Sequence, residues 1–280
     1  MLKRSKIFCF IVLTTLVSAG CEKKTDWLLQ DLSGEFVVVD GNITNETKIQ
    51  EIRLLKPVRH PNELPEVIHG AEVLISTEED VYSFIEDTSN PGYYRSEEIF
   101  AGKVGRTYSL IINYNNQIIS AKAYMVQATD FVFLRYVRQG STKLFRIVWV
   151  ANPYNAKRPA MYEIFLDWSA VSGYENADPD ETRARLLYYT LPTLDVSQIF
   201  APAMETVLFP PGTMITEKRY SLTTEHAEFI RALLSETNWQ GSLFNSASAN
   251  LPTNLSSNGI GYFGACAVTT RSEVARSLLP

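Results

Sequence analysis

Short apolar runs separated by turn residues fill the first third of the chain, and they constrain its fold more than any other feature. Tyr108, Leu110 and Ile112 lie on one face of an extended chain, with Ser109 on the other. So many short runs within about 90 residues leave no room for a helix and are typical of an antiparallel β-sandwich. The expected strands are 36–39, 49–55, 71–76, 81–85, 92–95, 107–114 and 117–125.

Two dipeptides in this region predict tight turns. Asn115-Asn116 separates two apolar runs at hairpin spacing, and Asp40-Gly41 follows the first run. The strand pattern closes without the second half of the chain. We therefore predict one domain over residues 35–126 and a second over residues 127–280.

The second half is less regular but also rich in strand patterns. A helix is expected after Thr224, a plausible N-cap, because apolar residues then recur at helical spacing on one face. That face comprises Phe229, Ile230, Leu233 and Leu234 and should pack on a sheet. The expected strands are 144–151, 161–168, 186–191 and 259–269.

The first twenty residues have the features of a targeting signal. Basic Lys3, Arg4 and Lys6 precede an apolar run over residues 7–17, which is too short to span a membrane as a helix. Ser18-Ala19-Gly20 then stands directly before Cys21, which resembles a bacterial lipoprotein signal. The resemblance implies removal of residues 1–20, lipid attachment at Cys21 and a tether over residues 21–34. An ordinary secretory signal followed by an incidental cysteine is the alternative.

Charge and cysteine content exclude several classes of function. The net charge of −5, which becomes −8 without residues 1–20, argues against nucleic acid as a partner. Three histidines and three cysteines exclude His-rich or Cys-rich metal chemistry. With Cys9 removed and Cys21 acylated, Cys266 has no disulfide partner, and its apolar surroundings predict a buried, inert thiol.

No catalytic motif is present, and we predict no catalytic residue, no metal site and no cofactor. Neither Gly-x-Ser-x-Gly nor His-Glu-x-x-His occurs, and His60, His69 and His226 have no orienting group nearby in the sequence. Asn176-x-Asp178-x-Asp180 has the ligand spacing that opens a calcium loop. The segment from Asn176 to Glu181 lacks the rest of such a loop, so a solvated acidic loop is the favoured interpretation and calcium binding the alternative.

Aromatic residues gather in the second half. Most should pack in the core, because strands favour tyrosine and tryptophan. Tyr154 and Tyr174 fall in expected loops, so they are the candidates for contact with a ligand. Paired carboxylates of a glycosidase type depend on tertiary distances and stay open at this point.

Several short motifs resemble known families. Gly70-Ala71-x-Val73-x-Ile75 and Gly92-x-Tyr94 resemble small Ig-like, carboxypeptidase-regulatory-like modules of bacterial surface proteins. Three further motifs, Val38-Val39-Asp40-Gly41, Gly102-Lys103-Val104-Gly105-x-Thr107-Tyr108 and Asn254 through Gly261-Tyr262-Phe263-Gly264-Ala265, resemble an uncharacterised family of Bacteroidota outer-membrane lipoproteins. The resemblance implies an N-terminal Ig-like antiparallel β-sandwich followed by a second β-rich domain with one or two short helices.

The same resemblance implies a lipid-anchored protein of the outer membrane, facing the cell surface, encoded beside SusC/SusD-like TonB-dependent receptors. The leading hypothesis is a non-enzymatic accessory subunit of such a nutrient-uptake complex. The alternatives are a surface hydrolase that processes glycans or peptides, and an adhesin that uses its Ig-like module as a spacer. A periplasm-facing orientation also remains open.

Overall fold

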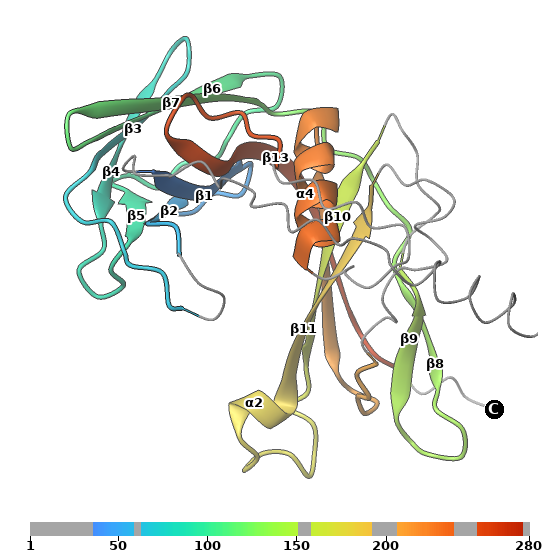
Figure 1. The fold of residues 1–280 in the computed structure, drawn as a ribbon. Helices are drawn as coiled ribbons and strands as arrows, with labels where there is room; N and C mark the ends of the chain where they lie inside the picture. The colour runs from blue at the N-terminus through green and yellow to red at the C-terminus, as the bar shows by residue number, and fades with distance from the viewer. Residues whose placement is uncertain (1–35, 59–62, 151–157, 192–205, 238–250, 277–280) are drawn as a thin grey trace, which may run out of the picture. The chain divides into compact units, whose positions relative to one another are not determined.

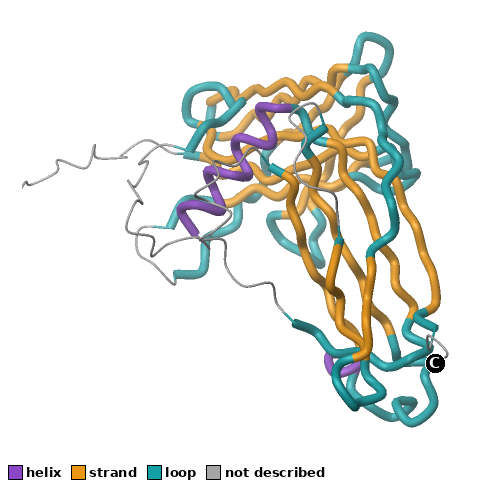
Figure 2. Tube along the Cα trace, turned by 90° about the vertical axis from the view of Figure 1, so that its right-hand side faces the viewer, coloured by secondary structure: helices purple, strands orange, loops and turns teal. Residues whose placement is uncertain are grey.

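The computed structural model describes residues 36–58, 63–150, 158–191, 206–237 and 251–276. The chain divides into two compact units, residues 1–34 and residues 35–280, and only the larger one contains described residues. Strands dominate the described part, in which two helices occur (Figure 2). The predicted mainly β fold with one or two short helices is therefore confirmed. No helix in the described ranges is long and apolar enough to cross a bilayer.

The first seven strands lie close to the predicted positions. The predicted hairpin turn at Asn115-Asn116 is confirmed, since both residues have positive φ angles, 49° and 61°, between paired Tyr114 and Gln117. The strands are β1 (Val37–Thr44), β2 (Glu51–Leu55), β3 (Glu72–Ser76), β4 (Val81–Glu86), β5 (Tyr93–Ser96), β6 (Thr107–Tyr114) and β7 (Gln117–Tyr124).

The predicted turn at Asp40-Gly41 is wrong, because β1 continues through both residues. Gly41 is buried, and a Cβ atom there would lie 2.9 Å from Cγ1 of Ile52 on the neighbouring strand. Glycine at this position therefore allows β1 and β2 to pack closely, and it does not bend the chain.

Eight strands surround the first core in the order β13-β1-β2-β5-β4-β3-β6-β7 (Figure 1). All pairs within this set are antiparallel except β1 with β13 (Gly259–Val274), which run parallel from Val37↔Gly259 to Thr44↔Cys266. The predicted antiparallel arrangement thus holds for every pair but one, and that one involves a strand from the far end of the chain.

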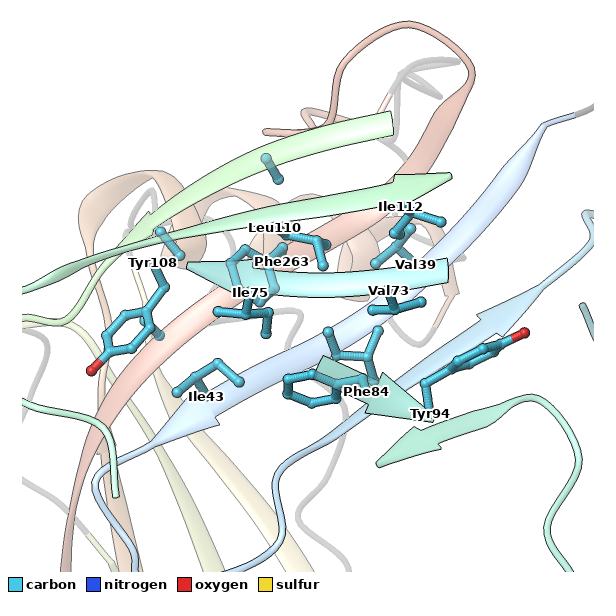
Figure 3. Packing of buried hydrophobic residues seen from close by; sticks show 14 of the residues in the cluster. Val39, Ile43, Val73, Ile75, Phe84, Tyr94, Tyr108, Leu110, Ile112 and Phe263 are labelled. Carbon is cyan, nitrogen blue, oxygen red and sulfur yellow. The ribbon is translucent and has the colours of Figure 1, made fainter. Parts of the chain in front are cut away.

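The first core contains side chains from both ends of the sequence. Phe263 of β13 is fully buried among Leu110, Ile75 and their neighbours, as Figure 3 shows. On the other side, Ser120 of β7 exchanges hydrogen bonds with Ser256, with distances of 2.9 Å and 2.8 Å. Residues 35–126 therefore do not complete their own sheet, contrary to the expected closure without the second half.

Expressed alone, residues 35–126 should fail to melt cooperatively. They lack Phe263 and the rest of β13, and each large buried apolar side chain contributes about 1.5–3 kcal/mol to a total stability of about 5–15 kcal/mol. Thermal circular dichroism and NMR dispersion of this segment, compared with residues 35–280, measure the effect. A cooperative melt with a dispersed spectrum would show that seven strands suffice, and would support the domain boundary predicted at residue 126.

The second half forms an antiparallel sheet in the order β11-β10-β12-β13 and a two-stranded hairpin, β8-β9. The sixteen residues of β13 serve both halves: its first part pairs with β1, and Ala267–Val274 pairs with β12. The remaining elements are β8 (Arg135–Arg138), β9 (Phe145–Trp149), β10 (Ala160–Asp167), α2 (Pro179–Thr182), β11 (Arg183–Thr190), β12 (Met214–Ser221) and α4 (Thr224–Thr237).

The predicted helix is present as α4, but its cap differs by one residue. The hydroxyl oxygen of Thr223 accepts a hydrogen bond from the backbone N–H of His226 at 3.2 Å, so Thr223, not Thr224, caps the helix. Leu234 is buried and Phe229 stacks on Tyr262 of β13, with ring centroids 5.0 Å apart. Most of the predicted apolar face thus packs on a sheet, as expected, but Leu233 is 37% exposed.

Candidate functional site

Of the three residues predicted to carry lipid or to contact a ligand, one lies in the described part of the chain. Cys21 and Tyr154 fall outside the described residues. Tyr174 is half-buried in the loop between β10 and α2, and its side chain packs against the second core. Its proposed contact with a ligand stays a prediction.

The acidic loop before β11 is organised around a helix end. Asp178 is the N-cap of α2, and its Oδ1 accepts a hydrogen bond from the backbone N–H of Asp180 at 3.1 Å. One carboxylate of the calcium-like spacing is thus engaged in capping. Within the described ranges, no three His, Cys, Asp or Glu side chains are placed to hold a metal ion.

His69 forms an exposed pair with Glu86, with 2.7 Å between Nδ1 and Oε1. The Glu86 carboxylate also accepts from the backbone N–H groups of Gly70 and Gly92. Burial raises the pKa of Glu86, but these hydrogen bonds outweigh burial and hold the pKa below its usual range. Glu86 therefore links His69 to the backbone at Gly70 and Gly92. His60 lies outside the described residues.

A buried thiol and an imidazole meet where α4 packs on β13. Sγ of Cys266 lies 3.7 Å from Nδ1 of His226, whose ring stacks on Tyr262 at 4.5 Å between centroids. Burial raises the pKa of the Cys266 thiol to about 12 and lowers that of His226 to about 4. Both groups are neutral at pH 7, so the contact is not the thiolate–imidazolium pair of a cysteine nucleophile. The prediction of a buried Cys266 is confirmed.

Ionisable side chains are also buried within the sheet of the second half. Glu163 of β10 accepts from Arg185 and, at 2.7 Å, from the hydroxyl of Tyr220. Burial is the main cause of a raised Tyr220 pKa, and the Glu163 carboxylate adds to it. Both oxygens of Glu163 are thus satisfied by neighbouring strands, as a structural network requires.

Arg219 of β12 is buried with neutral partners. Its guanidinium donates to Oγ of Ser221 at 2.6 Å, to the hydroxyl of Tyr162 at 3.3 Å and to the backbone oxygen of Arg158 at 3.3 Å. No ion pair within the described ranges involves Arg219. Its hydrogen bonds join β10, β12 and the segment just before β10 into one network.

Glu217, two residues earlier on β12, is fully buried. Its Oε2 accepts from the backbone N–H of Leu134 at 2.9 Å, while Oε1 has no hydrogen-bond partner among the described residues. Burial raises the Glu217 pKa to about 7, although the Leu134 hydrogen bond and Arg271 oppose the rise. This carboxyl therefore titrates near neutral pH while it holds the segment that links β7 to β8.

The β8–β9 hairpin has a buried and an exposed face. Phe145 and Ile147 point into the second core, where Phe145 pairs with Phe209. On the other face, Val137 lies opposite Arg146 in the ladder, and the guanidinium of Arg135 lies over the ring of Trp149, 5.4 Å from its centroid. The hairpin thus covers the core on one side and presents arginine and apolar side chains on the other.

The sequence around this hairpin is unusual in its charge. Residues 131–162 contain six Lys or Arg and no Asp or Glu, although the whole chain carries a net charge of −5. The motifs for metal ligands, nucleophiles and aromatic clusters do not include this feature. An acid-free run in an acidic chain is the signal that would have revealed it.

The chain is thus a mainly β protein whose two cores share one long strand and whose second core is covered by a basic hairpin. It belongs to a family described as a domain of unknown function (DUF4249), whose model matches residues 25–272. This agrees with the resemblance to an uncharacterised family. No curated protein matches the sequence.

Two solved structures with fibronectin type III domains are similar in part. The FN1–FN3 domains of chicken CNTN1 match with 12% identity and a TM-score of 0.27, covering 87% of this chain and 68% of that one. A two-domain fibronectin type III segment of chicken tenascin matches with 9% identity and a TM-score of 0.19, covering 67% of this chain and 89% of that one. With TM-scores this low, neither structure superposes on this chain as a whole.

Proposed function

We propose that the protein is an outer-membrane lipoprotein, anchored through Cys21 at the cell surface, that acts as a non-enzymatic accessory subunit of a SusC/SusD-like, TonB-dependent nutrient-uptake complex. The observation that carries the proposal is the apolar run of residues 7–17 followed by Ala19-Gly20-Cys21. The resemblance to Bacteroidota lipoproteins encoded beside such receptors supplies the partner. Acylation by more than one chain gives stable anchoring, whereas a single chain binds only marginally.

Three of the side chains that could have served catalysis have structural partners, which supports an accessory role. His226 and Cys266 pack together as neutral groups, and Glu163 is engaged by Arg185 and Tyr220. Anchoring favours docking, because confinement to one membrane raises the effective concentration of a partner. A standard interface of about 1,600 Å² could then be occupied at modest intrinsic affinity.

Crosslinking in intact cells, followed by mass spectrometry, should recover a TonB-dependent receptor with the wild-type protein. The matched control is Cys21→Ser, which should lose incorporation of a clickable fatty acid together with the crosslinks. Crosslinks only to periplasmic or peptidoglycan partners would contradict the docking role. Persistent fatty-acid labelling of Cys21→Ser would contradict the anchor, and turnover of glycans or peptides by the pure protein would favour the hydrolase.

A further inference from the structure

We propose that the outer face of the β8–β9 hairpin binds the anionic headgroup surface of a membrane. This basic face comprises Arg135, Val137, Arg146, Val148 and Trp149 of the two strands, together with the exposed Lys143 of the turn that joins them. The proposal goes beyond the role in uptake, and it rests on the proposed anchor only for the location of the protein beside a bilayer.

The charges of the basic face are available to a partner. Arg135, Lys143 and Arg146 are exposed, and none of them takes part in an ion pair with another described residue. Several basic residues elsewhere on the protein differ in this respect: Arg95 contacts two carboxylates, and Lys218 lies 2.6 Å from Glu46. The face therefore carries positive charge that the fold does not neutralise.

The hairpin's inner face explains why these side chains point outward. Phe145 and Ile147 are buried, and Tyr136 packs edge-on against Phe145 with 5.2 Å between centroids. Because side chains alternate across a strand, burying these residues turns Arg146 and Val148 away from the core. Packing of the inner face on the core thus holds the strand residues of the basic face toward the solvent.

Apolar exposure beside the charges favours a lipid surface. Val137 and Val148 of the basic face are 37% and 39% exposed, and Val132, in the segment before β8, is 56% exposed. The guanidinium of Arg135 lies over the ring of Trp149. Amphipathic tryptophan rings and the cationic ends of arginine side chains are both favoured at membrane interfaces. Arginine and lysine near an anionic bilayer each contribute about 1 kcal/mol of attraction, and exposed valines can enter the headgroup region. A nucleic-acid backbone, by contrast, would gain nothing from the exposed valines.

Binding to vesicles tests the proposal without the lipid anchor. The chain of residues 21–280 carrying Cys21→Ser is sedimented with phosphatidylcholine vesicles that contain or lack phosphatidylglycerol. We expect binding only to the anionic vesicles, weakening as added salt screens the charges. The triple variant Arg135→Gln, Lys143→Gln, Arg146→Gln should bind roughly a hundredfold more weakly, since three charges are lost.

The matched control removes three exposed basic residues elsewhere: Lys103→Gln, Lys122→Gln and Arg183→Gln. It has the same net charge and should keep its binding to anionic vesicles, and thermal melts confirm that both variants fold. Equal loss in both variants would show that total charge, not this face, drives binding, and would overturn the proposal. Absence of binding to anionic vesicles would also overturn the proposal. It would be overturned as well if the hairpin crosslinked only to an acidic protein and not to lipid. Neither outcome depends on acylation or on the uptake complex.

Discussion

Replacing Gly261 with alanine is expected to destabilise the protein by about 2–6 kcal/mol, the sum of backbone strain and overpacking. Gly261 has a φ of +100°, and a Cβ atom there would lie 2.2 Å from the backbone oxygen of Val39 on β1. That atom belongs to a paired strand and cannot move aside without breaking the β1–β13 ladder. Because total stability is about 5–15 kcal/mol, the variant should be unfolded or nearly so at moderate denaturant concentration.

Gly173→Ala is the matched control for this variant. Gly173 has a φ of +95°, close to that of Gly261, but no atom lies within 4 Å of the position its Cβ would take. It should therefore show only the strain of the backbone, about 1–3 kcal/mol. Urea unfolding of both variants measures the difference. If Gly261→Ala costs no more than Gly173→Ala, close packing of β13 on β1 does not limit this position.

The pH dependence of stability should change markedly when Glu217 is replaced by glutamine. The Glu217 pKa is raised to about 7 in the folded protein, chiefly by burial, from an ordinary value of 4.5. The folded state thus binds a proton that the unfolded state releases between these values, so stability falls as the pH rises from about 4.5 to 7. A displacement of this size corresponds to roughly 3 kcal/mol. Glu217→Gln, which has no proton to release, should lack this fall.

The charged groups near Glu217 do not reverse this expectation. Arg271 favours the ionised carboxylate, whereas Glu273 opposes it, and both lie on β13. Glu228→Gln on the exposed side of α4 removes the same charge without touching a buried carboxyl, so it should keep the wild-type slope. Chemical denaturation at several pH values between 4.5 and 8 gives the curves. Parallel curves for the wild-type protein and Glu217→Gln would contradict the buried, titrating carboxyl.

Several parts of the fold follow from local sequence alone. The alternation of apolar residues around Leu110 predicts β6, and Asn115-Asn116 predicts the hairpin turn, because both depend on the conformations of adjacent residues. The helical spacing around Leu234 likewise predicts α4, and an apolar stretch predicts a buried Cys266. In each case the sequence signal lies within about ten residues of chain.

Other features depend on partners that are distant in sequence. β12 contains Glu217, Lys218 and Arg219 in consecutive positions, and this charged run does not predict a strand. It is a strand because β10 and β13 pair with it on either side. The partners of its charges come from several parts of the chain: the backbone of Leu134 for Glu217, Glu46 for Lys218, and Tyr162 of β10 for Arg219. The same holds for Gly41, which reads locally as a turn residue until the close contact with Ile52 is known.

The sequence by itself determined where the first seven strands lie, where the chain turns at Asn115-Asn116, and that Cys266 is buried. Only the tertiary structure decided that β13 completes the first sheet and also pairs with β12, and that Arg146 of β9 lies opposite Val137 on the exposed face of the β8–β9 hairpin. Strand propensity is a property of a few neighbouring residues. The choice of partner strand is made by burial and register between segments more than 200 residues apart, such as Val37 and Gly259, and no local pattern encodes it.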